Sequence, residues 1–212
     1  MVLLVILGVC AVNIANVLLE YNSEKQKSDN EVSAFIEQVK EKQSEEGNAT
    51  SEEGETPDNS TEYDLTGSTM GVITIEKIDV VAPVTVGTDE LSLKSYAGIY
   101  PEYDPIGTDG GNTVMAAHSA IYGYCAHCFF HRLSELVPGD TIEVLWRNGV
   151  TYKYRVYEIL MNEDPSRVDV FDRVPGKEVL TLVTCTDGNS SVRTFLHAER
   201  IDNPPLGNNP EG

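Results

Sequence analysis

Basic side chains are scarce in this sequence. Its 212 residues include 15 lysines and arginines against 34 aspartates and glutamates, which gives a formal net charge of −19. A chain this acidic repels a phosphate backbone instead of neutralising it. We therefore expect no nucleic-acid partner.

Cysteine is also scarce, and no internal repeat is visible. Four cysteines in a chain of this length are too few for a disulfide scaffold. Hydrophobic residues make up 41% of the chain, which suits one domain with a buried core plus some non-globular sequence. The composition therefore excludes a disulfide-held scaffold and argues against a two-domain enzyme.

Residues 1–19 contain no charged side chain. A helix of about 20 apolar residues is what the hydrocarbon core of a bilayer requires. A cleaved secretory signal would need a basic segment before the apolar one, and no basic residue precedes it here. We expect a membrane anchor at 1–19.

Residues 20–69 are expected to form an acidic linker. Between positions 20 and 64 the chain carries fourteen acidic and four basic residues. Val32, Phe35, Ile36 and Val39 follow the spacing i, i+3, i+4, i+7, which predicts one short amphipathic helix that docks on the domain or on a partner. The polar stretch 44–61 predicts a disordered, self-repelling spacer.

From Met70 the sequence changes to short alternating runs separated by glycine, proline and aspartate. This sequence pattern is typical of an all-β domain, which we place at 70–202. A polar tail follows at 203–212. Asn148-Gly149 is a hairpin signal, and the stretch 128–140 predicts a helix that Pro138-Gly139 ends. The expected strands lie at 71–78, 80–86, 112–117, 141–147, 150–160, 179–184 and 192–201. So many strands in about 130 residues favour a closed barrel, here of eight strands.

Three residues at strand ends suggest nucleophilic chemistry. Cys185 ends the strand "LTLVT", Arg193 begins the next strand, and His118 ends the strand "NTVMAA". A thiol attacks a carbonyl as thiolate, a guanidinium can face the resulting oxyanion, and an imidazole can protonate a leaving amine. Each residue taken alone is more often structural, and Cys185 could simply pack in the core.

Together these residues carry a family resemblance. "TLVTC" at 181–185, the downstream Arg193 and the upstream "AAHS" at 116–119 resemble the sortase family of cysteine transpeptidases, as does "FHRLSELVPGD" at 130–140. The resemblance implies Cys185 as nucleophile, His118 as acid and base, and Arg193 as the residue that stabilises the oxyanion, with no metal or cofactor. It does not single out a class within the family.

The resemblance also implies partners and a location. Sortases cut an LPxTG-like sorting signal between Thr and Gly, hold the acyl half as a thioester, and pass it to a peptidoglycan-precursor or pilin amine. The expected partners are therefore secreted proteins with a C-terminal sorting signal and such an amine. The expected location is the cell membrane, with a single span and an extracellular catalytic domain.

Cys125 and Cys128 form a competing motif, "CAHCFFH". A zinc site would need a second ligand pair, and a thioredoxin-like redox site would need a βαβ context. A local disulfide suits an oxidising compartment better, and a reactive Cys128 at a helix N-terminus is a further alternative. The non-enzymatic interpretation is an anchored surface domain with a disulfide or metal at this motif.

Overall fold

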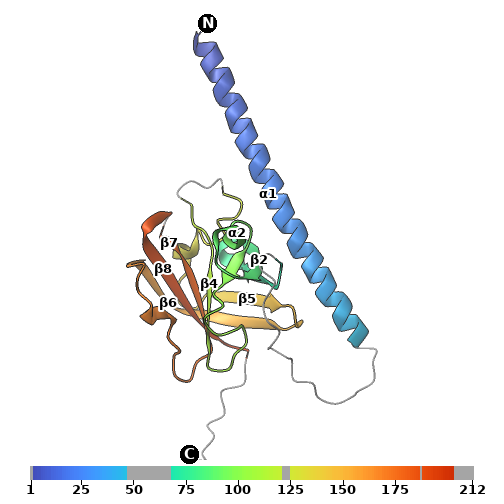
Figure 1. Cartoon of the computed structure of the whole chain (residues 1–212), viewed down its shortest axis with the longest axis vertical. Coiled ribbons are helices and arrows are strands. Elements are labelled where there is room, and N and C mark those ends of the chain that lie inside the picture. The colour runs from blue at the N-terminus through green and yellow to red at the C-terminus, as the bar shows by residue number, and fades with distance from the viewer. Residues whose placement is uncertain (1, 47–67, 121–124, 187, 203–212) are drawn as a thin grey trace, which may run out of the picture.

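Eight strands form a closed barrel in this computed structural model, which describes residues 2–46, 68–120, 125–186 and 188–202 (Figure 1). Neighbouring strands follow the order β1-β2-β3-β4-β7-β8-β6-β5, and the predicted eight-stranded barrel is confirmed. The strands are β1 (Gly71–Ile75), β2 (Val80–Val86), β3 (Ala97–Ile99), β4 (Asn112–Ala116), β5 (Thr141–Trp146), β6 (Thr151–Glu163), β7 (Val179–Thr186) and β8 (Asn189–Arg200).

The strand pairing shows why the run before Cys185 is continuously buried. Strands β4 and β7 pair in parallel, as do β2 and β3, and the other pairs are antiparallel. Leu182 belongs to the barrel core, whereas its neighbour Val183 belongs to a second apolar cluster. Because both faces of β7 are covered, the strand has no solvent-facing positions before Cys185.

The predicted hairpin at Asn148-Gly149 is confirmed. Gly149 has a φ of 80°, a left-handed conformation that favours glycine, and its N–H donates to the carbonyl of Trp146 at 2.9 Å. After the turn Tyr152 and Tyr154 face the core, so the strand alternates between its two faces from Tyr152 onward, whereas Val150 is exposed.

The helix predicted at 128–140 is wrong. This segment consists of turns and one short 3₁₀ helix, η2 (Leu133–Glu135). Phe130, Leu133 and Leu136 are spaced by three and are buried in the barrel core. In a 3₁₀ conformation, side chains three residues apart lie on the same side of the segment. This spacing therefore turns all three side chains toward the core. Two further 3₁₀ helices, η1 (Glu76–Ile78) and η3 (Asp169–Phe171), and one short helix, α2 (Glu90–Leu93), complete the domain.

The predicted short amphipathic helix is part of a much longer one. Helix α1 (Val2–Glu46) runs for 45 residues and lies along one side of the barrel (Figure 1). No proline or glycine occurs between Leu19 and Glu46, so nothing in the backbone ends the helix there. The spacer and tail predicted by the sequence fall mostly on 47–67 and 203–212, which lie outside the described residues.

Helix α1 docks on the barrel through the apolar positions that the sequence singled out. Val32, Phe35 and Val39 are buried against Val72 of β1 and Leu145 of β5. Farther along, the Gln43 side chain donates to the Gly149 carbonyl at 2.9 Å. Of the two alternatives for this amphipathic face, the structure shows docking on the domain.

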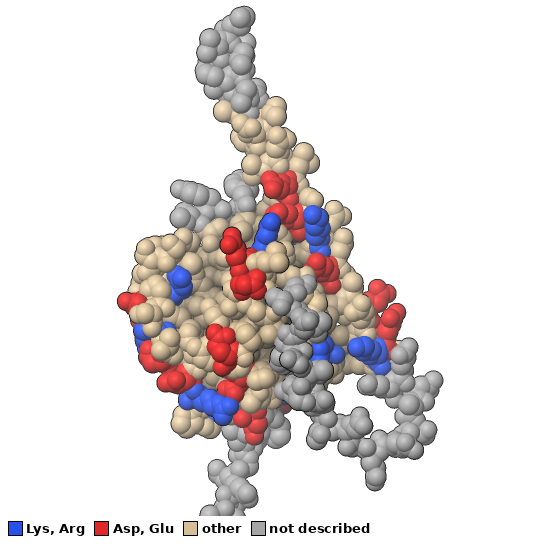
Figure 2. Space-filling model, in the orientation of Figure 1, with Lys and Arg blue, Asp and Glu red and all other residues tan. Residues whose placement is uncertain are grey.

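The described part of α1 before Glu20 is uncharged and stands clear of the barrel (Figure 2). Its exposed apolar side chains are Val12, Ile14, Val17, Leu18 and Leu19. Within the described part of the chain, no helix combines the length and apolar character needed to cross a membrane.

Candidate active site

Cys185 and Arg193 lie directly opposite each other. Strands β7 and β8 pair in antiparallel register, and Cys185 is the partner of Arg193 across that ladder. In the same register Val183 faces Phe195, and both belong to the apolar cluster on the outer face of the barrel. Since side chains two apart in a strand share a face, Cys185 and Arg193 continue this outer face toward the end of the sheet.

His118 reaches the same level from the other side of β7. The parallel register of β4 and β7 pairs Ala116 with Val183, so His118 and Cys185 each follow this pair by two residues. The strands stay in contact beyond the last pair, because the Ala117 N–H donates to the Val183 carbonyl at 3.3 Å. The rim row, as we call His118, Cys185 and Arg193, therefore crosses the ends of three adjacent elements.

Solvent reaches all three members of the rim row. His118 is exposed, whereas Cys185 and Arg193 are half-buried, and Cys185 is a free thiol. The Arg193 Nη1 donates to the Ser190 carbonyl at 2.8 Å and to the Val192 carbonyl at 3.3 Å. These bonds hold the guanidinium at the turn of its own hairpin.

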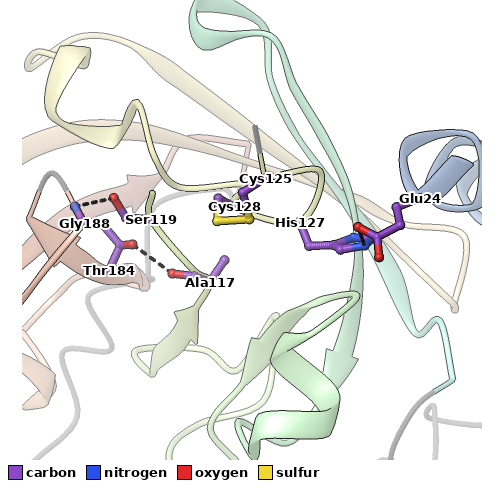
Figure 3. The surroundings of a disulfide bond; sticks show 8 residues. All are labelled: Glu24, Ala117, Ser119, Cys125, His127, Cys128, Thr184 and Gly188. Carbon is purple, nitrogen blue, oxygen red and sulfur yellow. Dashed lines mark hydrogen bonds and ion pairs between the residues drawn. A yellow bond between two sulfur atoms is a disulfide. The ribbon is translucent and has the colours of Figure 1, made fainter. Parts of the chain in front are cut away.

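Two hydroxyl groups link the His118 segment to β7 and its turn (Figure 3). The Thr184 hydroxyl donates to the Ala117 carbonyl at 2.8 Å, one residue before His118. The Gly188 N–H donates to the Ser119 hydroxyl at 3.0 Å, one residue after it. The residues on each side of His118 are thus tied to residues that precede and follow Cys185.

The outer face below the rim row is apolar. Its floor is formed by Val114, Ala116, Val183 and Phe195, and aromatic side chains from two loops pack on it. Phe171 lies 5.7 Å from Phe195 and 5.1 Å from Tyr103, measured between ring centroids. These aromatic side chains cover the floor, whose four residues are buried.

Tyr100, Tyr103 and Phe171 form an aromatic wall on this outer face. Tyr100 connects this wall with the rim row. Burial raises the pKa of its hydroxyl, the carboxylate of Glu102 raises it further, and the guanidinium of Arg193 opposes both. No role was predicted for Tyr100 or Phe171 from the sequence. Both lie in segments between strands, and their only signal in the sequence is a large aromatic residue where polar residues are usual.

An ion pair joins the two loops that carry these aromatic residues. Asp104, after Tyr103, pairs with Arg173, after Phe171, and the Arg173 Nε donates to the Asp104 Oδ2 at 2.9 Å. The hydrogen bond from Arg173 is the main cause that lowers the pKa of Asp104. The Asn112 N–H also donates to this carboxylate, which fixes both loops to the start of β4.

The other histidines do not compete with His118 for the rim row. His197 lies on the same outer face of β8 but four residues from Arg193, about 13 Å along the strand. It is buried, and its Nδ1 lies 3.1 Å from the Thr181 hydroxyl. His127 and His131 belong to the segment around the Cys-x-x-Cys motif, where His127 pairs with Glu24 of α1 at 3.3 Å.

Cys125 and Cys128 form a disulfide, as one of the alternatives predicted. Two sulfurs bonded to each other are not available as thiolate ligands for zinc. The motif also lies in a turn between β4 and η2, a context different from the βαβ unit of a thioredoxin-like site.

Comparison with known proteins identifies the family. The model of the Sortase domain matches residues 73–201, more than half of the chain. This chain therefore belongs to the sortase family. Sortases are cysteine transpeptidases.

Individual relatives agree with this assignment. Sortase A of Streptococcus agalactiae serotype III (strain NEM316) is 31% identical over 132 residues, 61% of this chain and 52% of that protein. Sortase D of Bacillus subtilis (strain 168) is 29% identical over 142 residues, 64% and 66% of the two chains. The present chain thus spans about half to two thirds of the length of these two relatives.

A solved structure shows the same similarity in three dimensions. Sortase A from Corynebacterium diphtheriae, in a lid mutant, has a TM-score of 0.57 and 27% sequence identity to this chain. The similar region covers 65% of the present chain and 72% of the other.

Proposed function

We propose that this protein is a sortase-type transpeptidase that acts through a Cys185 thioester on an LPxTG-like sorting signal. The observation that carries the proposal is the rim row, in which the strand registers bring His118, Cys185 and Arg193 to one level of the barrel. Family membership supports the reaction type, and the free, half-buried thiol of Cys185 suits a nucleophile.

In this mechanism Cys185 attacks as thiolate. Its sulfur bonds to the carbonyl carbon of the threonine in the sorting signal, and the carbonyl oxygen becomes an oxyanion that the Arg193 guanidinium stabilises. His118, as imidazolium, protonates the departing glycine amine, which breaks the peptide bond and leaves a thioester. The nucleophile, the acid and base, and the oxyanion donor are all side chains of this chain.

An acceptor amine completes the reaction. His118, now neutral, removes a proton as the amine attacks the thioester carbonyl, and the Cys185 thiolate leaves. The acceptor that we propose is an amine of a peptidoglycan precursor or of a pilin. The donors are secreted proteins with a C-terminal sorting signal.

We further propose that residues 1–19 anchor the protein in the cell membrane, with the barrel on the extracellular side. The support is the absence of charge from these residues and the exposed apolar side chains that α1 carries before Glu20. Membrane association after removal of residues 1–19 tests the anchor. A truncated protein that fractionates with membranes like the full chain would contradict it.

Mass spectrometry of the protein incubated with a panel of sorting-signal peptides tests the transpeptidase proposal. The expected result is an acyl adduct on Cys185 that is released by an added amine. Cys185→Ala should abolish the adduct, whereas Cys10→Ser, which removes the other free cysteine, should leave it unchanged. No adduct on any peptide, or an adduct that survives Cys185→Ala, would favour the non-enzymatic surface domain.

A further inference from the structure

The Cys125–Cys128 disulfide lies in the segment that returns from His118 to the barrel core. Two residues after Cys128, the Phe130 N–H donates to the carbonyl of His118 itself at 3.2 Å. The Phe130 side chain is fully buried in the barrel core. This hydrogen bond ties the backbone of His118 to the segment that follows the disulfide.

The disulfide also stabilises the turn that leads to Phe130. The Cys128 N–H donates to the Cys125 carbonyl at 3.4 Å, and the His131 N–H donates to the Cys128 carbonyl at 3.1 Å. Within the described residues these two hydrogen bonds support the backbone of the turn, and the covalent bond between the sulfurs closes it. Opening a closed turn raises the number of conformations that it can adopt.

Helix α1 supports the same turn from its other side. The His127 Nε2 lies 3.3 Å from a carboxylate oxygen of Glu24, and the His127 ring contacts Phe129 edge to face. The His127 Nδ1 is buried and has no hydrogen-bond partner among the described residues. In Figure 3 the disulfide lies between the His127–Glu24 pair and the hydroxyl links around His118.

Small reductants can reach the disulfide. Both cysteines are half-buried, and both line a cleft of about 270 Å³ between α1 and the barrel. Tyr21 and Lys25 of α1 form part of the opposite wall of this cleft.

We propose that the Cys125–Cys128 disulfide is a redox-sensitive positioning element for His118, and that its reduction by a dithiol slows transpeptidation. A thiolate of the dithiol attacks one sulfur, and the other cysteine leaves and takes up a proton. The second thiol of the reductant then attacks the mixed disulfide, which releases the second protein thiol and leaves the reductant as a cyclic disulfide. The turn opens, and the hydrogen bond from Phe130 to His118 loses its fixed geometry.

The inference rests on the proposed function, because the rate of transpeptidation is one of its measurements. The other measurement is independent of activity: hydrogen exchange of the amides in 117–120 and 125–131, with and without a dithiol. We expect faster exchange after reduction in this segment and unchanged exchange in β5 and β6. The double variant C125S/C128S should exchange like the reduced protein and should not respond to the dithiol.

The kinetic test separates positioning from peptide binding. In C125S/C128S and in the reduced wild type, kcat should fall about tenfold, and KM for the peptide should stay unchanged. This loss is smaller than the roughly 100-fold or greater fall in kcat that is expected when an acid-base group is removed. Reoxidation of the wild type should restore kcat. The matched control is Cys10→Ser, which should retain the response to the dithiol.

Each result has a defined meaning. Unchanged exchange and unchanged kcat in the reduced wild type would overturn the inference, and the reduced wild type decides the question even if C125S/C128S does not fold. A fall in kcat that reoxidation does not reverse would also overturn it. If the wild type forms no thioester with any peptide, the proposed function fails, and hydrogen exchange still tests the link between the disulfide and the His118 segment.

Discussion

Cys185 differs from every other residue of β7 in its exposure. The strand is buried from Val179 to Thr184 and again at Thr186, and Cys185 alone is half-buried. A thiol in this position is accessible from solvent, whereas the side chains on either side of it in the strand are not. The guanidinium of its register partner Arg193 is held by two carbonyls of its own hairpin.

We expect Arg193→Ala to lower kcat about 100-fold, because one oxyanion donor of this kind contributes about that much to catalysis. Arg193→Lys should recover part of the loss, since an ammonium keeps the charge but not the planar donor geometry. Steady-state cleavage of a sorting-signal peptide measures both. A kcat within threefold of wild type in Arg193→Ala would refute the role of Arg193.

Burial of His197 predicts that acid destabilises the fold. Removal from water lowers the pKa of its imidazole below the ordinary value, Glu158 opposes this effect, and Arg167 adds to it. Below pH about 6.5 the unfolded chain therefore binds a proton that the folded protein excludes. The free energy of unfolding should fall as the pH drops below this value.

Urea unfolding at pH 7.5 and pH 5.5 measures this contribution of His197. His197→Gln should reduce the difference in unfolding free energy between the two pH values. Identical pH dependence in wild type and His197→Gln would show that another group is responsible.

Helix α1 is the element that differs most from the prediction made from the sequence. The sequence predicts an anchor, then a linker with one short helix, whereas the structure has a single helix from Val2 to Glu46. Its docked part covers β1 and β5, and its Glu24 reaches the turn that follows His118. The segment between the apolar N-terminus and the barrel is therefore docked on the domain as far as Gln43.

Truncation of the docked face of α1 should destabilise the protein. Phe35 is 6% exposed, and Phe35→Ala should lower the free energy of unfolding by about 3 kcal/mol through lost burial and the cavity left behind. Val17→Ala, on the exposed part of the same helix, should change it by less than about 0.5 kcal/mol. Fluorescence of Trp146, the single tryptophan, reports unfolding at the β1–β5 pair.

If Phe35→Ala were as stable as wild type, α1 would not be docked in solution as it is in the structure. A change of similar size in both variants would instead point to an effect on the helix as a whole.

At the scale of the whole molecule, helix α1 has two parts. Its apolar N-terminal part is uncharged, and its later part is charged and docks on the barrel. The contacts of α1 with the barrel begin near Tyr21 and Glu24, directly after the uncharged residues 1–19. The two parts of this continuous helix therefore have different surroundings, and they should contribute differently to stability.

Two truncations test this division. A chain that begins at residue 20 should keep its thermal midpoint within about 2 °C, because few contacts with the barrel are lost. A chain that begins at residue 47 should melt about 10 °C lower or more, because Val72 and Leu145 lose their cover and each buried apolar side chain is worth about 2 kcal/mol. Equal midpoints in the two truncated chains would contradict the docking of α1.

The sequence by itself determined the features that depend on local pattern. Alternating β-branched runs and turn residues indicated the barrel strands, Asn148-Gly149 indicated its hairpin, and the signature around Cys185 indicated the family. These signals are readable because strand period, turn chemistry and a short motif each involve neighbouring residues. The roles of His118, Cys185 and Arg193 were assigned from the same motif, and they stay predictions.

The tertiary structure alone decided the features that depend on distant pairing. The parallel register that brings His118 level with Cys185, the aromatic wall on the outer face, and the docking of α1 all join segments far apart in the chain. The 3₁₀ turn at Leu133 replaced a predicted helix because its side chains fill a core that other strands define. Such outcomes follow from which surfaces meet, and the surfaces exist only once the barrel has closed.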